Sequence, residues 1–560
     1  MASYPTARLC LWMLALSLSG MAQKPAPEDC TTCHDQGAKV AKSAHAVVAC
    51  AECHVKHETY PHPTGIAKPV CASCHISETG DYALSVHGQA AKKGNAAAPD
   101  CAMCHGAAHE TIATKTGDFH KNVPDTCGMC HGEIAAQYNA SVHGKAVARG
   151  VFDAPVCTDC HGEHSILSPK NQSSTVSARR VPETCGRCHN DVRLAKRFGL
   201  PPDRITSYES SFHGLAMKSG SQTVANCASC HGIHNILPSS DAKSKTNIRN
   251  LSATCGRCHP GAGTRFAIGK MHWVEGASEP RPVQLVRSAY LLLIPLTIGF
   301  MILHHGGDWV RKLLRLRLRA RQMVAPPMIP FVGEMRMMRF ERVQHALLAI
   351  SFIVLAWSGF ALKYPDQWWA RPLVFGEGAY PLRGLIHRTA AVIMVAAGVI
   401  HILSLVLNKR LREHWLELLP VRNDVYEMLG VFFYNLGLKR TRPVVSPHSY
   451  VEKVEYWAVV WGTFIMGLTG LLLWANNYTL RLIPREWLDV ATSIHFYEAV
   501  LASLAILIWH FYTVIFDPDV YPMDAAWLTG RSVRKRAGHH HAAQGAHPEE
   551  SAGGAAKSSD

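Results

Sequence analysis

The 560-residue sequence is poor in charged residues, which make up 18% of the chain against roughly 25% in an average soluble domain. Acidic residues are the scarcer sign, with 42 Asp and Glu against 57 Lys and Arg. Proline and glycine are present in ordinary amounts, which excludes a collagen-like chain and does not favour a disordered one. The basic excess between positions 22 and 283 is dispersed, so it does not indicate a nucleic-acid-binding face. A low charged share with 48% hydrophobic residues instead suggests membrane segments.

The N-terminus has the features of a secretory signal peptide over residues 1–22. Arg8 precedes a short apolar run from Leu9 to Leu18, and small residues follow near Ala22. An uncleaved anchor helix is the alternative, although the run is short for a membrane span. Cys30 has no lipobox before it, so we do not expect a lipoprotein anchor. Export predicts that the residues after the signal lie in the bacterial periplasm.

Cysteine is absent outside one pattern, apart from Cys10 in the predicted signal peptide. The other 18 of the 19 cysteines form nine Cys-x-x-Cys-His motifs. A single motif would also suit zinc or a redox-active pair, but nine with no cysteine left over predict covalent haem c, with the histidine as proximal iron ligand. The predicted attachment cysteines are Cys30, Cys33, Cys50, Cys53, Cys71, Cys74, Cys101, Cys104, Cys127, Cys130, Cys157, Cys160, Cys185, Cys188, Cys227, Cys230, Cys255 and Cys258. The predicted proximal ligands are His34, His54, His75, His105, His131, His161, His189, His231 and His259.

An internal repeat predicts the distal ligands. After the leading motif at Cys30, four repeats follow, each with a histidine, a motif, a second histidine and a second motif. In three repeats the first histidine stands in a Ser-x-His-Gly string at the same distance before a motif cysteine, as His87 does before Cys101. The eight repeated histidines are the distal candidates: His45, His57, His87, His109, His143, His164, His213 and His234. A ninth distal ligand can come from His62, His120 or His272.

Two histidines on each iron leave no open coordination site, so the haems are expected to conduct electrons and not to bind substrate. We therefore interpret residues 23–283 as a periplasmic nonahaem cytochrome c domain, with one leading haem and four two-haem repeats. Its repeats should stack into an array, and regular secondary structure should be sparse, because the porphyrins themselves form the core. The whole chain is predicted to be mainly α-helical.

Long apolar runs begin after residue 283 and predict a membrane domain over residues 284–516. Five spans are expected at 285–305, 343–362, 385–407, 455–475 and 494–516, with a shorter interfacial helix over 426–438. The segment from Arg311 to Arg321 has six basic and no acidic residues, which predicts that it faces the cytoplasm. This orientation places the N-terminal domain in the periplasm and the C-terminus in the cytoplasm. The tail at 517–560 is rich in Ala, Gly and His and is expected to be disordered, with at most a weak metal role for its His539–His541 run.

Histidines in the predicted spans indicate two haem b groups. The spacing from His387 to His401, and from His495 to His510, corresponds to about 21 to 23 Å along a helix. His387 and His495 both fall near the periplasmic ends of their spans and should hold one haem. The spacing leaves open whether His510 pairs with His345 or with His401.

Other residues of the spans have less specific interpretations. Gly359, Gly467 and Gly470 either admit porphyrin edges or pack helices closely. His304 and His305 are expected to snorkel toward the membrane surface, with a quinone pocket as the alternative.

Four strings in the membrane domain resemble the bacterial dihaem cytochrome b family, which includes the cytochrome b subunits of hydrogenases and formate dehydrogenases. They are Arg-Val-Gln-His ending at His345, Leu-Ile-His-Arg around His387, and Ile-His-Phe-Tyr-Glu around His495 with Trp-His-Phe around His510. The resemblance implies four haem-bearing helices over 343–516, preceded by an added helix. It also implies that His345 pairs with His510 and His387 with His495, leaving His401 as a competing candidate or close to the quinone.

The fusion of nine haems c to such a domain resembles the inner-membrane menaquinol-oxidising cytochromes of metal-reducing bacteria. The resulting hypothesis is a quinol dehydrogenase of anaerobic respiration, passing electrons from menaquinol through two haems b and nine haems c to periplasmic cytochromes or other redox proteins. Its other partners would be the quinone pool and membrane lipid, not nucleic acid. The alternatives are an electron-transfer and anchor subunit of a larger respiratory complex, and the reverse flow of electrons to quinone.

Overall fold

The computed structural model describes residues 29–55, 69–201, 203–267, 271–321, 334–374, 378–446 and 449–532. The predicted signal peptide, His57, His62 and the His539–His541 run lie outside these residues. The chain divides into two compact units. The first consists of Met1–Ala136 with Ala146–Leu167, and the second of Gln137–Lys145 with Ser168–Asp560.

The region of the Cys-x-x-Cys-His motifs is built from short helices joined by turns. Each motif forms about one helical turn, closed where the histidine backbone N–H donates to the carbonyl of the first cysteine, as His34 does to Cys30 at 3.0 Å. Both cysteines and the histidine thus emerge from a single turn. Up to His161 the helices are η1 Cys30–Thr32, α1 Gly37–Val40, α2 Cys50–Cys53, η2 Cys71–Ser73, α3 Ile76–Leu84, α4 Val86–Lys92, α5 Cys101–His105, η3 Ala108–Glu110, α6 Gly117–Gly128, α7 Gly132–Ala140, α8 Val142–Ala148 and α9 Cys157–His161.

The longer segment of the second compact unit, which begins at Ser168, starts with more short helices of the same kind. They are α10 Val181–His189, α11 Val192–Phe198, α12 Arg204–Ser210, α13 Phe212–Lys218, α14 Cys227–His231, α15 Leu251–Gly256 and η4 Thr264–Ala267. Side-chain cores in the motif region are small. One consists of Val123, Val147, Ala154 and Val156 packed against Cys127 and Cys157, so that it borders two predicted haem attachment points.

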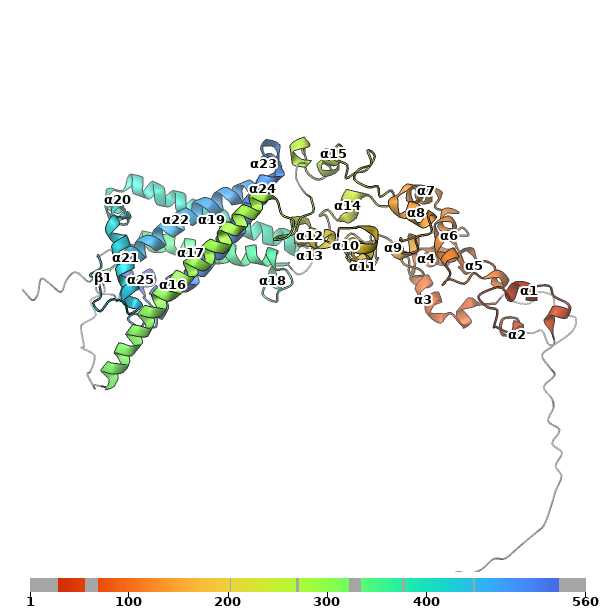
Figure 1. Ribbon diagram of the computed structural model, residues 1–560, viewed down its shortest axis with the longest axis horizontal. Helices are drawn as coiled ribbons and strands as arrows, with labels where there is room; N and C mark the ends of the chain where they lie inside the picture. Colours follow the sequence, from red (N-terminus) through yellow and green to blue (C-terminus); the bar gives the residue numbers. More distant parts are fainter. Residues whose placement is uncertain are drawn as a thin grey trace, which may run out of the picture. The chain divides into compact units, whose positions relative to one another are not determined.

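Five helices long and apolar enough to cross a membrane follow, in agreement with the predicted helical fold. They are α16 Arg281–Arg321, α17 Arg339–Lys363, α19 Ala379–Leu407, α22 Tyr450–Trp474 and α24 Arg485–Ala505, which continues through η5 Ile506–His510 and η6 Tyr512–Phe516. Figure 1 shows these helices running alongside one another, with α17 packed on α19 and α24 packed on both α16 and α22.

Shorter elements connect the long helices. They are α18 Arg371–Val374, α20 Lys409–Leu416, α21 Arg422–Asn435, α23 Asn476–Leu482 and α25 Ala526–Thr529, together with the antiparallel pair β1 Glu334–Met335 and β2 Arg531–Ser532. Residues 517–532, which we expected to belong to a disordered tail, therefore form ordered structure, because β2 has a strand partner.

Two of the long helices differ from their predicted form. Helix α16 has 41 residues and includes the basic segment Arg311–Arg321, which hydropathy had placed beyond the end of the span. The last span changes from α-helix to π-helix at Ile506, so the wider turns include His510. Wider turns of this kind often occur at functional sites, and they change the direction in which His510 points relative to His495.

Candidate haem sites

The 18 motif cysteines of the described chain are not joined in disulfides. The first cysteines of successive motifs instead lie close enough to hydrogen bond to one another. This occurs four times, between Cys30 and Cys50, Cys71 and Cys101, Cys127 and Cys157, and Cys185 and Cys227. Haems attached to such neighbouring thiols would have their edges close together, as rapid electron transfer between them requires.

Imidazoles in the motif region lie in pairs at the spacing that a haem iron needs. Metal–imidazole bonds are about 2 Å long, so two imidazoles on opposite sides of one iron place their ring centroids roughly 6 Å apart. Each pair combines one motif histidine with one additional histidine. The pairs, with centroid distances, are His45–His75 at 6.2 Å, His54–His109 at 5.8 Å, His87–His131 at 6.3 Å, His105–His164 at 5.9 Å, His143–His189 at 6.2 Å, His213–His259 at 6.2 Å and His231–His272 at 6.3 Å.

The pairing follows a rule that the repeat alone did not reveal. In every repeat the leading histidine lies beside the proximal histidine of the second motif, as His87 does with His131. In the second and third repeats the histidine after the first motif instead lies beside the first-motif histidine of the preceding repeat, His109 with His54 and His164 with His105. One candidate haem of a repeat is thus closed locally, while the other depends on the repeat that follows it.

The three candidates for a ninth distal ligand have different surroundings. His272 lies beside His231, and its Nδ1 is 2.8 Å from the Ser207 hydroxyl. Since that hydroxyl also donates to the Arg204 carbonyl, it can accept from Nδ1–H and leave Nε2 for iron. His120 instead has its Nε2 3.5 Å from a carboxylate oxygen of Asp159. His62 lies outside the described residues.

Burial keeps several of these imidazoles neutral, as iron ligation requires. Burial, with a smaller contribution from His189, lowers the pKa of His143 to about 4. Burial likewise lowers the pKa of His213 and of His272 to about 4. A neutral imidazole has a lone pair to donate to iron, whereas an imidazolium does not.

The serine and the glycine of the Ser-x-His-Gly string each have a local structural role. The Ser85 hydroxyl accepts from the Gly88 N–H at 3.0 Å and caps the short helix α4, so that His87 emerges from its first turn. The glycine allows close packing, because a Cβ on Gly88 would clash with the Tyr82 carbonyl oxygen. The same cap and the same close approach recur at Ser141 with Gly144 and at Ser211 with Gly214.

Two further imidazole pairs lie among the long helices. The ring centroids of His387 and His495 are 6.4 Å apart, and those of His345 and His510 are 6.2 Å apart. Both spacings suit a haem b iron between the rings. His401 is not beside either pair; its Nε2 is 2.9 Å from the Tyr456 hydroxyl and its Nδ1 is 3.3 Å from Gln344 Oε1.

The pair formed by His387 and His495 has matching surroundings on its two sides. Ser358 Oγ lies 2.8 Å from Nδ1 of His387, and Thr469 Oγ1 lies 2.9 Å from Nδ1 of His495. Each hydroxyl also donates to the carbonyl four residues earlier in its own helix, so it accepts from Nδ1–H and leaves Nε2 for iron. Gly359 and Gly470 follow these two residues, and a Cβ on either would be within 3.4 Å of the neighbouring imidazole. These two glycines therefore lie beside the imidazoles, whereas Gly467 faces Val395.

The pair formed by His345 and His510 is less symmetric. Nδ1 of His510 lies 3.3 Å from a carboxylate oxygen of Glu455, whose other oxygen accepts from the Thr513 hydroxyl at 3.0 Å. Nδ1 of His345 is buried without a hydrogen-bond partner among the described residues. A carboxylate acceptor makes an imidazole a stronger electron donor than a hydroxyl does, so the two candidate b sites should differ in reduction potential.

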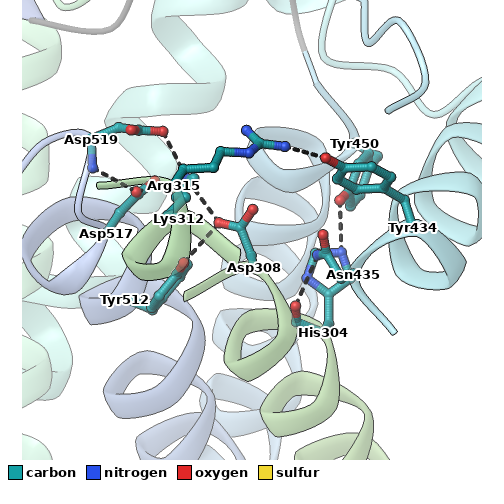
Figure 2. Close-up of polar contacts among 10 residues, drawn as sticks. All are labelled: His304, Asp308, Lys312, Arg315, Tyr434, Asn435, Tyr450, Tyr512, Asp517 and Asp519. Carbon is teal, nitrogen blue, oxygen red and sulfur yellow. Dashed lines mark hydrogen bonds and ion pairs between the residues drawn. The ribbon is translucent and has the colours of Figure 1, made fainter. Parts of the chain in front are cut away.

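A polar cluster, buried around Lys312, joins α16 to the rest of the helix bundle (Figure 2). Lys312 lies at its centre, 2.8 Å from Asp308, 2.7 Å from Asp517 and 3.1 Å from Asp519. Farther along α16, His304 Nε2 is 2.7 Å from the Tyr450 hydroxyl. His304 and His305 are only 3% and 6% exposed, so the expectation that they snorkel was wrong. The helix is long enough to bury them in the bundle. The cluster drawn is His304, Asp308, Lys312, Arg315, Tyr434, Asn435, Tyr450, Tyr512, Asp517 and Asp519.

Comparisons with known proteins match two parts of the chain. Residues 336–522 match the family described as prokaryotic cytochrome b561, and residues 147–194 match the doubled CXXCH motif. The formate dehydrogenase cytochrome b556 subunit of Haemophilus influenzae is 21% identical over 194 residues, which is 35% of this chain and 76% of that protein. The formate dehydrogenase cytochrome b556(fdo) subunit of Escherichia coli K12 is 20% identical over 196 residues, 35% of this chain and 85% of that protein. No solved structure matches the chain significantly. Helix α16 precedes the segment that the cytochrome b561 family matches.

Proposed function

We propose that this chain, a fusion of a multihaem cytochrome c region with a membrane-embedded prokaryotic cytochrome b561 domain, carries electrons from menaquinol to periplasmic acceptors. Two haems b would be held by His387 with His495 and by His345 with His510. Nine haems c would be held by the nine Cys-x-x-Cys-His motifs. Quinol gives up two electrons and two protons, and each haem accepts one electron at a time.

The observation that carries this proposal is the arrangement of imidazoles in seven pairs in the motif region and two pairs in the bundle. An iron between two such imidazoles would have a histidine on each side, since the ring centroids lie about 6 Å apart in the membrane bundle as in the motif region. Such irons have no position for a substrate, which leaves electron transfer as their chemistry. The haems themselves supply that redox chemistry, and the chain positions them and adjusts their potentials.

We place the quinol site near His401, next to the candidate haem of His345. Gln344 precedes His345, is only 8% exposed, and its amide nitrogen has no hydrogen-bond partner within the described part of the chain. His401 lies against the other end of that amide and against Tyr456, whose hydroxyl also accepts from Trp415 at 2.6 Å. The Gln344 amide can donate a hydrogen bond to a quinol oxygen, and the neighbouring His401 imidazole can accept the proton that the quinol releases. Polar groups within a membrane span are costly and usually functional.

The orientation that fits this route has the motif region in the periplasm and the basic end of α16 in the cytoplasm. The six basic residues of Arg311–Arg321 favour it under the positive-inside rule. Electrons would then travel from the bundle to the periplasmic side, and soluble redox proteins could collect them there.

A second candidate function is that of an electron-transfer and membrane-anchor subunit of a larger complex. The observation that favours it is that the similar proteins are named as subunits of formate dehydrogenases. In that case another subunit would supply the dehydrogenase, and electrons could run from the motif region to quinone.

A stopped-flow experiment separates these possibilities. The purified full-length chain is mixed with a reduced menaquinone analogue, and the b and c absorption bands are followed separately. We expect the b band to be reduced first and the c band to follow. If neither band is reduced by quinol while dithionite reduces both, the chain alone is not a quinol dehydrogenase, and the subunit function is favoured. Oxidation of prereduced haems by quinone without the forward reaction would indicate the reverse flow.

A further inference from the structure

We propose that the haem attached at Cys255 is where electrons pass between the membrane bundle and the c haems, and that Asn477 of the bundle positions its proximal ligand and sets its potential. The proposal rests on the proposed function, in which the Cys255 motif holds a haem c, and on the pairing of His259 with His213 described under Candidate haem sites. It does not depend on quinol being the reductant or on the direction of electron flow.

A direct hydrogen bond joins the proximal histidine of this motif to the membrane bundle. Nδ1 of His259 lies 3.0 Å from the amide oxygen Oδ1 of Asn477, in the short helix α23 between α22 and α24. With Nε2 on iron, Nδ1 keeps its hydrogen and donates it to Oδ1. This bond fixes the plane of the imidazole and increases its electron donation to iron, and stronger donation favours the ferric state.

The chain after His259 is held on both sides of that bond. The Arg481 guanidinium donates to the Pro260 carbonyl at 3.2 Å, and Arg265 donates to the Leu482 carbonyl at 3.1 Å. Gly261 has a φ of +85°, and a Cβ there would lie 2.5 to 2.8 Å from the Arg481 guanidinium. The motif therefore packs on α23 through several contacts. The hydrogen bond between His259 and Asn477 is one of these and not an isolated surface contact.

The second histidine of this pair also lies next to a contact with the bundle. His213, whose ring is 6.2 Å from that of His259, is preceded by Phe212 at the start of α13. The Phe212 ring packs edge-on against Tyr380 at 6.3 Å, and Tyr380 lies in the first turn of α19, the helix that carries His387. The two histidines that would hold the haem at Cys255 are thus both tied to the bundle, His259 through Asn477 in α23 and His213 through its neighbour Phe212 against α19. Thr469 and Gly470, which contact His495, stand shortly before α23 in the chain.

The test compares three variants of the full-length holoprotein. Asn477→Leu removes the acceptor at similar volume, Asn477→Asp provides a stronger acceptor, and Asn476→Leu is the matched control one position earlier in α23. Potentials are measured by mediated redox titration with low-temperature EPR of the low-spin ferric haems, without quinol. Covalent haem content and the b band verify that each variant has assembled.

We expect one c haem in Asn477→Leu to titrate at a more positive potential and to change its EPR g values, while the other haems keep theirs. In Asn477→Asp the same haem should shift to a more negative potential. Asn476→Leu should match the unaltered protein. Unchanged potentials in both Asn477 variants, or shifts of equal sign in both, would overturn the proposal, since a packing effect alone has no reason to reverse sign. A failure of quinol to reduce the protein would leave these titrations unaffected, so it would count against the proposed function only.

Discussion

The two regions of this molecule organise imidazoles into pairs by opposite means. In the motif region, short turns present cysteines and a histidine locally, and the second histidine comes from another part of the sequence, as with His45 and His75. In the bundle, long helices fix both histidines by packing, as α19 and α24 do for His387 and His495. The first design depends on covalent attachment, because its apolar core without haem is small. The second depends on helix packing, because its haems are held only through iron.

The largest expected difference between the two regions is in how firmly they hold haem, and extracting the haem that is not covalently bound should show it. Acid–acetone extraction should remove two haems and leave nine, since thioether bonds survive acid whereas iron–histidine bonds do not. A pyridine haemochrome assay before and after extraction measures both numbers. Seven or fewer retained haems would contradict the assignment of all nine motifs.

Single ligand substitutions should remove one haem from the bundle. His345→Ala and His510→Ala should each abolish the same b haem, because their rings share one candidate iron at 6.2 Å spacing. His401→Ala, which alters a histidine bonded to Tyr456 and Gln344, should keep both b haems and slow quinol oxidation. Optical redox titration of the b band measures haem content. Loss of a b haem in His401→Ala with retention in His345→Ala would reverse the ligand assignment.

In the motif region, replacing a distal histidine should affect a haem whose attachment motif lies far from that histidine in the sequence. His164→Ala should open the haem at Cys101, whose proximal His105 it faces at 5.9 Å, although His164 follows the motif at Cys157. One haem should become high-spin, and the covalent haem content should stay the same. Site assignment needs a double variant with His105→Ala, in which no second high-spin haem should appear. A second opened haem would show that His164 ligates its neighbouring motif.

Packing of α16 should matter for the bundle and not for the motif region. Lys312→Ala leaves Asp308 and Asp517 buried without their cation, which typically costs about 3 to 5 kcal/mol. Thermal release of haem b should therefore begin at a lower temperature, while the covalent c haems remain attached. Lys409→Ala is the control, since Lys409 pairs with Glu413 at the exposed surface of α20 and its loss should change little. Equal effects of the two substitutions would argue that the buried cluster does not hold α16 in place.

The sequence was sufficient for the features that repeat or extend over long stretches. Five membrane helices and a motif region of short helices agree with the predicted fold, because hydropathy and motif spacing are properties of the chain itself. The length of α16 was not predictable from hydropathy, since its polar residues, such as Lys312, are compensated by partners far along the chain, such as Asp517. The burial of His304 depends on Tyr450 in the same way.

The candidate ligands were visible in the sequence, but their partners were not. The repeat singled out His109 and His164, yet only the folded chain brings each beside a motif of the preceding repeat. Asn477 carried no signal at all, because it belongs to no motif and its contact with His259 joins segments that are distant in the sequence.

His272 has a consequence for how such a chain can change in length. In the observed pairs a histidine of one repeat lies beside a motif of the repeat before it, so the first motif of the last repeat needs a histidine from elsewhere. His272 lies beside His231 and would supply that ligand. A repeat duplicated in tandem would bring both the histidine that its predecessor needs and the one that it needs itself. The array can therefore gain or lose haems two at a time without altering the segment between His259 and α16. Haem arrays of different length could in this way be joined to an unchanged membrane domain.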